Sequence, residues 1–316
     1  MNAEKSMLTS TQSALGGPEV LEIVTAPRPT PRTNEILVRV HAAGLNPTDW
    51  KHRATGGFLG QPPFTLGWDV SGVVEAVGIG VASFAPGDEV FGMLSYPFGH
   101  GSHAEYVAAP ARWFARKPGN VDHVQAGALP LVALTAWQAL HDYAGLAAGQ
   151  RVLIHAGAGG VGHVAIQLAK ARGAHVIATA SEPKHAFLRE LGADETIDYR
   201  TEDVALRAGV VDVVLDTQGG ETAQRSLAAL RPDGVLVSTI PLASPELLAE
   251  AQRRGVRAVP FLVDASRADL ESMTPLIEDG RLRATIAATF PLRDLAEAHR
   301  LGDTGRTAGK IVVTMG

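Results

Sequence analysis

Residues 152–162 read Val-Leu-Ile-His-Ala-Gly-Ala-Gly-Gly-Val-Gly, and this stretch decides the fold class. An apolar, β-branched run leads into a Gly-x-Gly-x-x-Gly turn, and an apolar pattern of helical period begins at Val161. A strand, a glycine turn and a helix in this order form the context that a dinucleotide-binding turn needs. The alternative is a glycine-rich turn that only packs against its neighbours.

The glycines of this turn have separate expected roles. Gly157 is expected to permit the tight turn, Gly159 to let the backbone approach a pyrophosphate, and Gly162 to let the helix pack close to the strand. The helix N-terminus offers unpaired N–H groups and a partial positive charge to phosphate. We therefore predict that the cofactor is bound by Gly157, Ala158, Gly159, Gly160, Val161 and Gly162.

The composition is that of an ordinary globular protein and argues against several classes. The chain has 316 residues, 46% hydrophobic and 19% charged, with a formal net charge of −5. This length favours two domains. There is no basic stripe for nucleic acid, no apolar run of membrane length, and no secretory signal in the polar residues 1–11. The absence of cysteine excludes disulfides and thiolate zinc sites. We expect a cytoplasmic protein without nucleic-acid or membrane partners.

The pattern along the chain predicts two kinds of architecture. Short strand candidates between Pro- and Gly-rich loops fill the first part of the chain and are typical of an antiparallel sandwich or barrel. They lie at residues 35–41, 72–77 and 89–92. Residues 124–143 look helical, with two helices around Pro130.

From residue 151 onward, six strand candidates alternate with helices, which predicts an α/β fold with a doubly wound parallel sheet. The strands are expected at 151–155, 175–180, 195–198, 211–216, 234–240 and 257–263, and the helices at 160–172, 183–191, 222–230 and 245–254. After residue 264 the pattern changes to helix 269–278, strand 284–290, helix 292–301 and strand 310–314. This tail is expected to return to the first domain. The predicted domains are therefore 1–122 with 264–316, and 123–263.

The end of the second strand of this sheet indicates the cofactor. An acidic residue about 20 residues past the glycines would bind the adenine ribose and repel a 2′-phosphate. Strand 175–180 instead ends in Ala180, followed by Ser181 and Lys184, and a hydroxyl and an ammonium suit a phosphate. Tyr199, at the tip of the third strand, is expected to face the same phosphate. We therefore predict NADP(H).

Two alternatives stay open at this position. Glu182 would favour NAD if it turned inward, but the first turn of a helix is where an outward negative charge is favoured. Lys184 is, in the alternative interpretation, a solvated helix lysine.

Several segments outside the turn carry a family resemblance. Residues 44–49 read Gly-Leu-Asn-Pro-Thr-Asp, residues 67–74 read Gly-Trp-Asp-Val-Ser-Gly-Val-Val, and residues 87–92 read Gly-Asp-Glu-Val-Phe-Gly. Together with residues 15–21 and 104–107, they resemble the medium-chain dehydrogenase/reductase superfamily, close to its zinc-free quinone oxidoreductase group. Where the alcohol dehydrogenase branch has a zinc-binding cysteine and histidine, this sequence has Asn46 and Trp68, and Asp69 replaces a glutamate.

The resemblance implies a Rossmann domain inserted in a β-rich, GroES-like catalytic domain. It also implies hydride transfer from NADPH to a quinone or an α,β-unsaturated carbonyl, usually in a homodimer. Further cofactor contacts are implied for Thr135 and for residues at strand ends, where ligands bind in such sheets. The strand-end residues are Thr217, Ser238, Ile240, Phe261 and Val263. For Thr135 the alternative is a hydroxyl bonded to its own helix.

The residues at the former zinc positions predict a metal-free site. Quinones and enones spread the negative charge that hydride addition creates, so they need less help from a Lewis acid than alcohol–ketone interconversion does. We expect Asn46 to bind the substrate oxygen through its neutral amide, with Asp49 and Lys51 contributing. Trp68 and Tyr96 are expected to line the substrate pocket. The alternatives are an Asn46 that fixes the Asn-Pro turn, an Asp49 that orients the loop, a solvated Lys51 and a core Trp68.

Two other functions remain open from the sequence alone. One is an enoyl-thioester reductase of polyketide or fatty-acid type. The other is a non-catalytic NADPH-binding protein. No metal site is predicted, because His100 and His103 lie in a glycine-rich loop without a carboxylate at ligand spacing.

Overall fold

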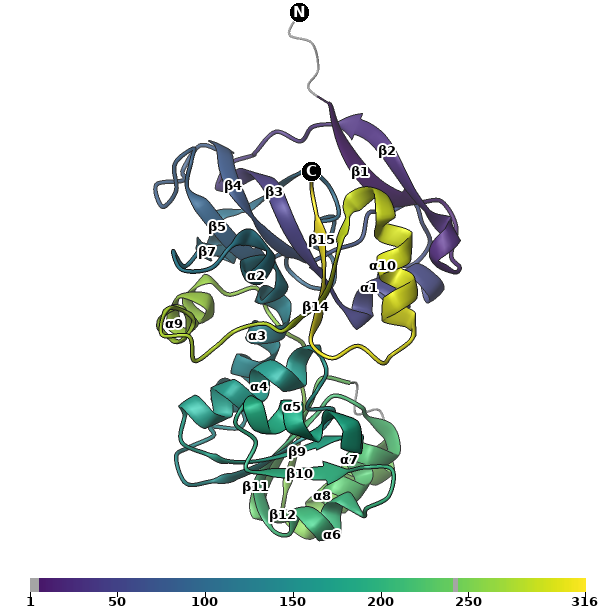
Figure 1. Cartoon of the computed structure of the whole chain (residues 1–316), viewed down its shortest axis with the longest axis vertical. Helices are drawn as coiled ribbons and strands as arrows, with labels where there is room; N and C mark the ends of the chain where they lie inside the picture. The colour runs from purple at the N-terminus through teal and green to yellow at the C-terminus, as the bar shows by residue number, and fades with distance from the viewer. Residues whose placement is uncertain (1–5, 241–243) are drawn as a thin grey trace, which may run out of the picture. The chain divides into compact units, whose positions relative to one another are not determined.

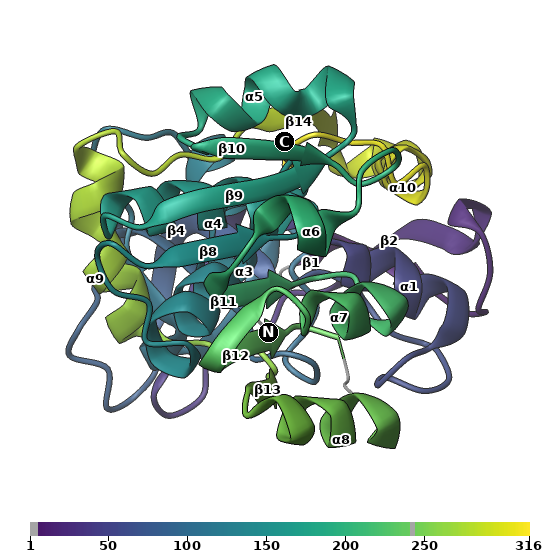
Figure 2. The same ribbon diagram turned by 90° about the horizontal axis from the view of Figure 1, so that it is seen from below.

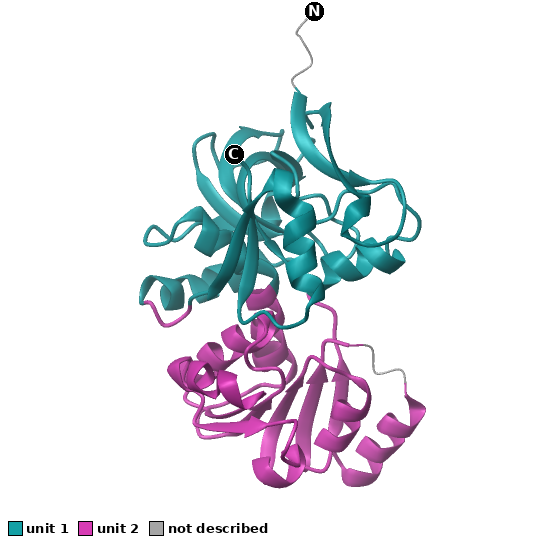
Figure 3. Cartoon of the chain, turned by 45° about the vertical axis from the view of Figure 1, so that its right-hand side comes forward, with its two compact units in different colours: residues 1–131, 264–279, 283–316 teal, residues 132–263, 280–282 magenta. Residues whose placement is uncertain are grey.

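The computed structural model describes residues 6–240 and 244–316, so residues 1–5 of the polar N-terminal segment lie outside it. The chain divides into two compact units (Figure 3). Unit 1 comprises Met1–Leu131, Asp264–Asp279 and Arg283–Gly316, and unit 2 comprises Val132–Val263 and Gly280–Leu282. The first change of unit falls at Leu131, inside a helix, and not at residue 122. In the described part of the chain, no helix is both long and apolar enough to cross a membrane.

Unit 2 is built on a six-stranded sheet in which all neighbouring strands are parallel (Figure 2). The strand order is β10-β9-β8-β11-β12-β13. The strands are β8 (Arg151–Ile154), β9 (His175–Ala180), β10 (Glu195–Asp198), β11 (Val211–Asp216), β12 (Leu230–Ser238) and β13 (Arg257–Pro260). The order runs from β8 to one edge and from β11 to the other, which confirms the predicted doubly wound sheet.

Helices cover the sheet, so its central strands are apolar on both faces. The helical segments are α3 (Pro130–Trp137), a π-helix (Gln138–Tyr143), α4 (Gly160–Ala171), η4 (Glu182–Lys184), α5 (His185–Glu190), α6 (Val204–Ala208), α7 (Gly220–Ser226) and α8 (Pro245–Arg254). Strand residues such as Leu153, Val214 and Leu236 pack with Leu227, directly after α7, and with Leu247 of α8 in one buried cluster. The short α6 was not expected from the sequence, because five residues show no clear helical period.

Unit 1 contains a seven-stranded sheet and a separate hairpin (Figure 1). The sheet order is β14-β15-β3-β4-β5-β7, with β6 also paired to β3. The strands are β1 (Ser6–Gln12) and β2 (Leu21–Pro27) of the hairpin, then β3 (Glu35–Leu45), β4 (Asp69–Val77), β5 (Glu89–Met93), β6 (Tyr106–Pro110), β7 (Phe114–Arg116), β14 (Ile286–Pro291) and β15 (Lys310–Thr314). The tail returns to this unit because β15 pairs antiparallel with β3, Ile311 opposite Leu45.

Helices and short 3₁₀ turns complete unit 1. They are η1 (Pro18–Val20), α1 (Pro47–Thr55), η2 (Ala111–Trp113), α2 (His123–Ala128), α9 (Arg267–Glu278), η5 (Leu292–Asp294) and α10 (Leu295–Asp303). Helix α1 was missed by the sequence analysis, although Pro47 stands at its first position, where proline is favoured. This helix positions the candidate residues of unit 1.

Candidate functional site

The glycine turn lies between β8 and α4, as predicted, but its strained residue is Ala156. Ala156 has φ +49°, whereas Gly157 is not in the left-handed region. The structure adds close packing to the role expected of Gly157. A Cβ there would lie 3.0 Å from the Cβ of Ala178 and 3.1 Å from Cδ2 of Leu188. The turn is pressed against β9 and α5, and this contact fixes its position.

The N-terminus of α4 is suited to a phosphate group. A Cβ on Gly162 would overlap the carbonyl oxygen of Ala156, so only glycine lets the helix start this close to the strand. At Gly159, by contrast, a Cβ would have only one neighbour, the Ala156 oxygen at 3.2 Å. No side chain caps this helix at Gly159. This twelve-residue helix thus begins without a side-chain cap and with uncrowded space beside Gly159, two features that suit an anion.

The residues predicted for the 2′-phosphate follow two neighbouring strands. Ala180 of β9 is in register with Asp198 of β10, so Ser181 and Tyr199 emerge side by side at the same sheet edge. Ser181 precedes η4 and Lys184 ends it. The Tyr199 side chain is 55% exposed and Glu182 is also exposed. A hydroxyl, an ammonium and a phenol thus follow the two strand ends where the adenine ribose was predicted.

A buried carboxylate organises the next strand ends, and the sequence analysis missed it. Asp216 is fully buried at the end of β11. It accepts hydrogen bonds from the N–H groups of Gln218 and Gly219 and from the Ser238 hydroxyl at 2.7 Å. The same hydroxyl contacts the backbone of Ile240. Ser238 therefore holds a loop in place, and a cofactor contact would come in addition.

The remaining predicted cofactor residues lie in unit 2 and are mostly buried. Phe261 donates its N–H to the Ser238 carbonyl, and its ring lies 5.1 Å from that of Tyr143. Val263 and Thr135 are buried, whereas Thr217 is half-buried. Their contacts with a cofactor remain predictions.

In unit 1, residues from α1, β3, β4 and β15 form a buried charged cluster: Asn46, Asp49, Asp69 and Lys310. The Lys310 ammonium is 2% exposed and donates to the Leu45 carbonyl, the Asn46 amide oxygen and the Asp69 carboxylate, the last at 3.3 Å. Three donated bonds require the protonated ammonium, because a neutral amine has only two hydrogens. Lys310 was missed because it is far from Asn46 in sequence, and only the pairing of β15 with β3 brings them together.

The Asn46 amide is fully engaged in this cluster. Its nitrogen donates to the Gly44 carbonyl at 3.3 Å and to Asp69 at 2.8 Å, and its oxygen accepts from Lys310. The side chain is 1% exposed. A hydrogen bond from Asn46 to a substrate oxygen remains a prediction. It would require the amide nitrogen to give up its bond to the Gly44 carbonyl or its bond to Asp69.

Burial sets the protonation of the two carboxylates. Burial raises the pKa of Asp49 to about 8. The N–H of Asn46, which donates to Oδ2 at 2.7 Å, lowers that pKa but has the smaller effect. The other Asp49 oxygen is buried without a partner among the described residues. Burial also raises the pKa of Asp69, but Lys310, Asn46 and the Leu131 N–H all favour the charged form. We assign the ion pair to Asp69 and Lys310.

The donor set in unit 1 does not fit a catalytic zinc. Trp68 replaces a ligand with a ring that has no acceptor nitrogen, and the oxygens of Asn46 and Asp69 already hold an ammonium. Among residues 6–240 and 244–316, no three His, Asp or Glu side chains are grouped to hold a metal ion.

Beside the charged cluster lies an aromatic cluster: His52, Phe58, Trp68 and Tyr96. Ring centroids are 5.4 Å apart for His52 and Trp68, 5.3 Å for Trp68 and Tyr96, and 6.1 Å for Phe58 and Tyr96. Trp68 is 0% exposed and donates its indole N–H to the Pro97 carbonyl, whereas Tyr96 is half-buried and Phe58 is 54% exposed. The cluster thus runs from the core to the surface. Lys51 is exposed on α1.

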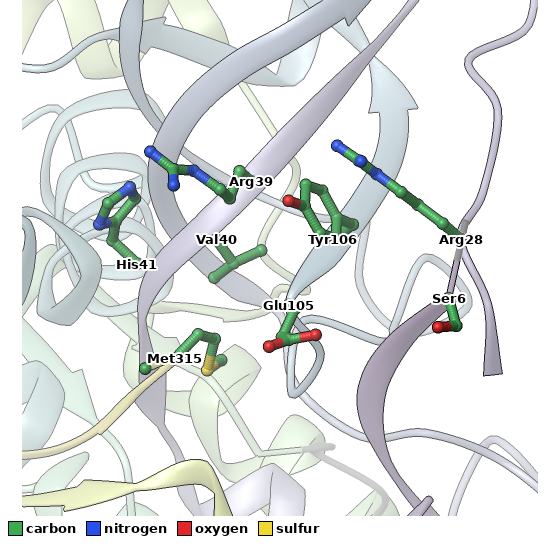
Figure 4. A pocket seen from close by; sticks show the side chains of 9 residues that line it. Ser6, Arg28, Arg39, Val40, His41, Glu105, Tyr106 and Met315 are labelled. Atoms are coloured by element: carbon green, nitrogen blue, oxygen red, sulfur yellow. The ribbon is translucent and has the colours of Figure 1, made fainter. Parts of the chain in front are cut away.

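A cavity of about 440 Å³ in unit 1 contains none of the predicted site residues (Figure 4). Arg28, Arg39, His41, Glu105 and Tyr106 line it. Arg28 pairs with Glu75 and stacks on the Tyr106 ring at 3.5 Å, and Glu105 accepts the Leu8 N–H at 2.7 Å. The charged side chains Arg28 and Glu105 of this cavity therefore already have partners within unit 1.

Comparisons with known proteins agree with this geometry. The alcohol dehydrogenase GroES-like domain matches residues 32–119, and the zinc-binding dehydrogenase family matches residues 191–313. The quinone oxidoreductase structure from Coxiella burnetii has a TM-score of 0.93 at 38% identity, covering 99% of this chain and 100% of that one.

Two curated relatives extend the comparison. The chloroplastic NADPH-dependent alkenal/one oxidoreductase of Arabidopsis thaliana is 35% identical, covering 98% of this chain and 80% of the relative. A spectinabilin polyketide synthase protein of Streptomyces orinoci is 39% identical over 95% of this chain, which corresponds to 14% of that protein.

Proposed function

Because the chain belongs to the medium-chain dehydrogenase/reductase superfamily, in its quinone oxidoreductase-like group, we propose that it is an NADPH-dependent reductase of quinones and α,β-unsaturated carbonyl compounds. The observation that carries the proposal is the uncapped and uncrowded N-terminus of α4 at Gly159, which is the place for the diphosphate. When bound, the reduced nicotinamide supplies a hydride. The residues of this chain bind and orient the two reactants and exclude water.

The two units divide this work between them. In unit 2, the turn from Gly157 to Gly162 binds the diphosphate, and Ser181, Lys184 and Tyr199 bind the 2′-phosphate. In unit 1, the accessible members of the aromatic cluster, Phe58 and Tyr96, offer apolar ring surface to a planar conjugated acceptor. Trp68 is fully buried and supports the Tyr96 ring from the core. The proposed reaction uses no zinc.

The charged cluster gives Asn46 and Asp49 a positioning role in this proposal. Both are buried, and Asp49 accepts the N–H of Asn46 at the start of α1. They hold this helix, and with it the aromatic cluster, in place against β15. Lys51 remains a candidate for a direct polar contact, because its ammonium is exposed on the same helix.

Steady-state NADPH oxidation tests the proposal. Purified protein is mixed with NADPH and, separately, with 1,4-naphthoquinone, an alkyl vinyl ketone and a crotonyl thioester of pantetheine. We expect turnover with the first two acceptors and little with the third. Turnover with the thioester alone favours the enoyl reductase, for which the polyketide synthase relative is the supporting observation. Tight NADPH binding without any turnover would indicate a non-catalytic binding protein.

The proposal extends to a homodimer, which the family resemblance supports, and to the cytoplasm, which is an expectation from the composition of the chain. The alkenal/one oxidoreductase of Arabidopsis is chloroplastic, so this relative does not support the cytoplasm for this chain. Sedimentation equilibrium and cell fractionation test the two statements separately.

A further inference from the structure

A directed chain of hydrogen bonds in unit 1 ends at the hydroxyl of Tyr96. It begins at the backbone N–H of Phe58, which donates to Nε2 of His52 at 3.2 Å. In a neutral imidazole one nitrogen accepts and the other carries the hydrogen. Since Nε2 accepts, Nδ1 is the protonated nitrogen, and it lies 2.7 Å from the Thr48 carbonyl and 3.0 Å from the Thr48 hydroxyl. Burial lowers the pKa of His52, which keeps the ring neutral near pH 7.

The direction of the next bond follows from this tautomer. The Thr48 hydroxyl has one hydrogen, and it cannot donate that hydrogen to a nitrogen that already carries one. It donates to the oxygen of Tyr96 at 3.1 Å. The phenol oxygen is therefore an acceptor toward Thr48, and its own hydrogen points to a different partner. The described residues provide no acceptor for it.

Tyr96 is also placed where a planar substrate would lie. Its ring contacts Trp68 on the buried side and Phe58 on the exposed side, both in edge geometry. Burial raises the pKa of Tyr96 and outweighs the hydrogen bond from Thr48, which lowers it, so the phenol keeps its proton at neutral pH. Such a group is a donor to an oxygen that becomes negative during a reaction.

We infer that Tyr96 donates a hydrogen bond, and then its proton, to the substrate oxygen, with Thr48 and His52 as positioning residues. This inference rests on the proposed function and names the acid that the function requires. Tyr96 was predicted from the sequence to line the substrate pocket; Thr48 and His52 were not predicted at all.

The step balances for an enone as follows. The hydride forms a bond to the β-carbon, the C=C π pair becomes a new double bond between the α-carbon and the carbonyl carbon, and the C=O π pair moves to the oxygen, which takes up the negative charge. That oxygen bonds to the Tyr96 proton as the phenol O–H bond breaks. The Thr48 hydroxyl stabilises the phenolate through the bond that it already donates. The phenolate takes a proton from water, and the enol product converts to the ketone.

Quinones provide an internal comparison for the test. Hydride addition to a quinone gives a hydroquinone anion, which is stable enough to take its proton from water. An enone gives a more basic enolate, which depends more on a positioned acid. Loss of the Tyr96 hydroxyl should therefore affect the enone far more than the quinone, and a general structural defect would affect both alike.

The experiment measures kcat and KM for an alkyl vinyl ketone and for 1,4-naphthoquinone in wild type, Tyr96→Phe and the control Tyr106→Phe. Tyr106 lies in the same unit but stacks on Arg28 and does not touch the aromatic cluster. We expect Tyr96→Phe to lower kcat with the enone about 100-fold, at the lower end for general acid catalysis. The quinone rate should change less than about threefold, and NADPH affinity and the Tyr106→Phe rates should be unchanged.

Thr48 variants test the positioning role. Thr48→Val removes the donated bond, and we expect about a tenfold loss with the enone, because the phenol is no longer oriented. Thr48→Ser keeps the hydroxyl and should restore the rate. The double variant Thr48→Val with Tyr96→Phe should be no slower than Tyr96→Phe alone, since Thr48 acts through Tyr96.

The outcomes separate this inference from the proposed function. Equal losses for enone and quinone in Tyr96→Phe, or no loss with either, overturn the role of Tyr96 while the reductase function stands. Additive losses in the double variant overturn the positioning role of Thr48. A wild-type protein that turns over neither acceptor overturns the proposed function, and the inference with it.

Discussion

In unit 2 the N-terminus of α4 has no side-chain cap, and a Cβ on Gly159 would have one neighbour. In the charged cluster of unit 1, by contrast, almost every polar group has a hydrogen-bond partner within the cluster or its backbone. Both regions contain strongly polar groups. The turn leaves its donors for a ligand, and the cluster uses Lys310 to hold Asn46 and Asp69. The difference teaches that polar groups without a protein partner indicate a place for a ligand, and that buried polar groups with partners indicate a contribution to the stability of the fold. The Tyr96 hydroxyl accepts a hydrogen bond from Thr48 but has its own hydrogen to donate, so it resembles the glycine turn more than the charged cluster.

The largest effect is expected from Lys310→Met, which tests whether the charged cluster is structural. The change leaves Asp69 buried with one partner fewer, and breaking a buried pair in this way costs about 3–5 kcal/mol. The free energy of unfolding, measured by urea titration with circular dichroism, should fall by that amount. Lys51→Met, at an exposed position, should stay within about 0.5 kcal/mol. Equal stabilities of the two variants would show that the cluster does not hold unit 1 together.

Gly159→Val tests whether the uncapped N-terminus of α4 binds the diphosphate. The branched side chain would occupy the space in front of α4, so NADPH affinity should fall about 100-fold, equivalent to about 2.7 kcal/mol. Titration of NADPH fluorescence measures it, and circular dichroism should show an unchanged fold. Gly119→Val is the matched control, because Gly119 also has free space and no positive φ. Wild-type affinity in Gly159→Val would contradict the assignment of the turn.

The buried histidines of unit 1 sharpen the comparison through pH. Burial lowers the pKa of His103 to about 3, and neither ring nitrogen has a partner among the described residues. The folded protein thus favours neutral His103, whereas the unfolded chain takes up a proton near pH 6.5. Stability from this residue is present above pH 6.5 and is lost as pH falls toward 3. Asp49, with its raised pKa, acts in the opposite direction.

A variant isolates the histidine contribution. Between pH 7.5 and 5.0 the wild type should lose about 2 kcal/mol more than His103→Leu, which has no group to protonate. Urea unfolding at both pH values measures this, with His141→Leu, at a half-buried position, as the control. Parallel pH dependence of wild type and His103→Leu would show that the ring is hydrated or paired in solution.

The smallest effect is expected at the sheet edge that bears Ser181 and Tyr199. Lys184→Ala should weaken NADPH binding about five- to tenfold, or about 1 kcal/mol, and leave NADH unchanged, because it removes a charge meant for the 2′-phosphate. Parallel titrations with both nucleotides measure the difference. An equal loss for both would place Lys184 away from that phosphate.

The parts of the fold that follow from local patterns could be predicted from the sequence. The parallel sheet of unit 2 follows from apolar strands that alternate with helices. The ends of β9 and β10 could be predicted from the polar residues that follow each strand. Helix α1 was missed because its few apolar residues show little helical periodicity, and its start is set by Pro47 and the Asp49 carboxylate. A polar helix of this kind depends on the contacts that its tertiary context provides.

The site of unit 1 was harder to predict than the turn. The turn is continuous in sequence, so spacing alone identifies it. The charged cluster joins residues 46 and 310 through the pairing of β15 with β3, and the Tyr96 chain joins α1 to the loop after β5. A lysine that opens the apolar strand at 310–314 is a local signal of a buried charge. Long-range pairing of this kind leaves no period in the sequence.

The most direct test of the central claim is a titration of the purified wild-type protein with NADPH, followed by nucleotide fluorescence and by calorimetry. We predict one saturable site per chain in the micromolar range, lost in Gly159→Val and kept in Gly119→Val. Absence of binding by the wild type at millimolar NADPH and NADH would contradict the account at its base.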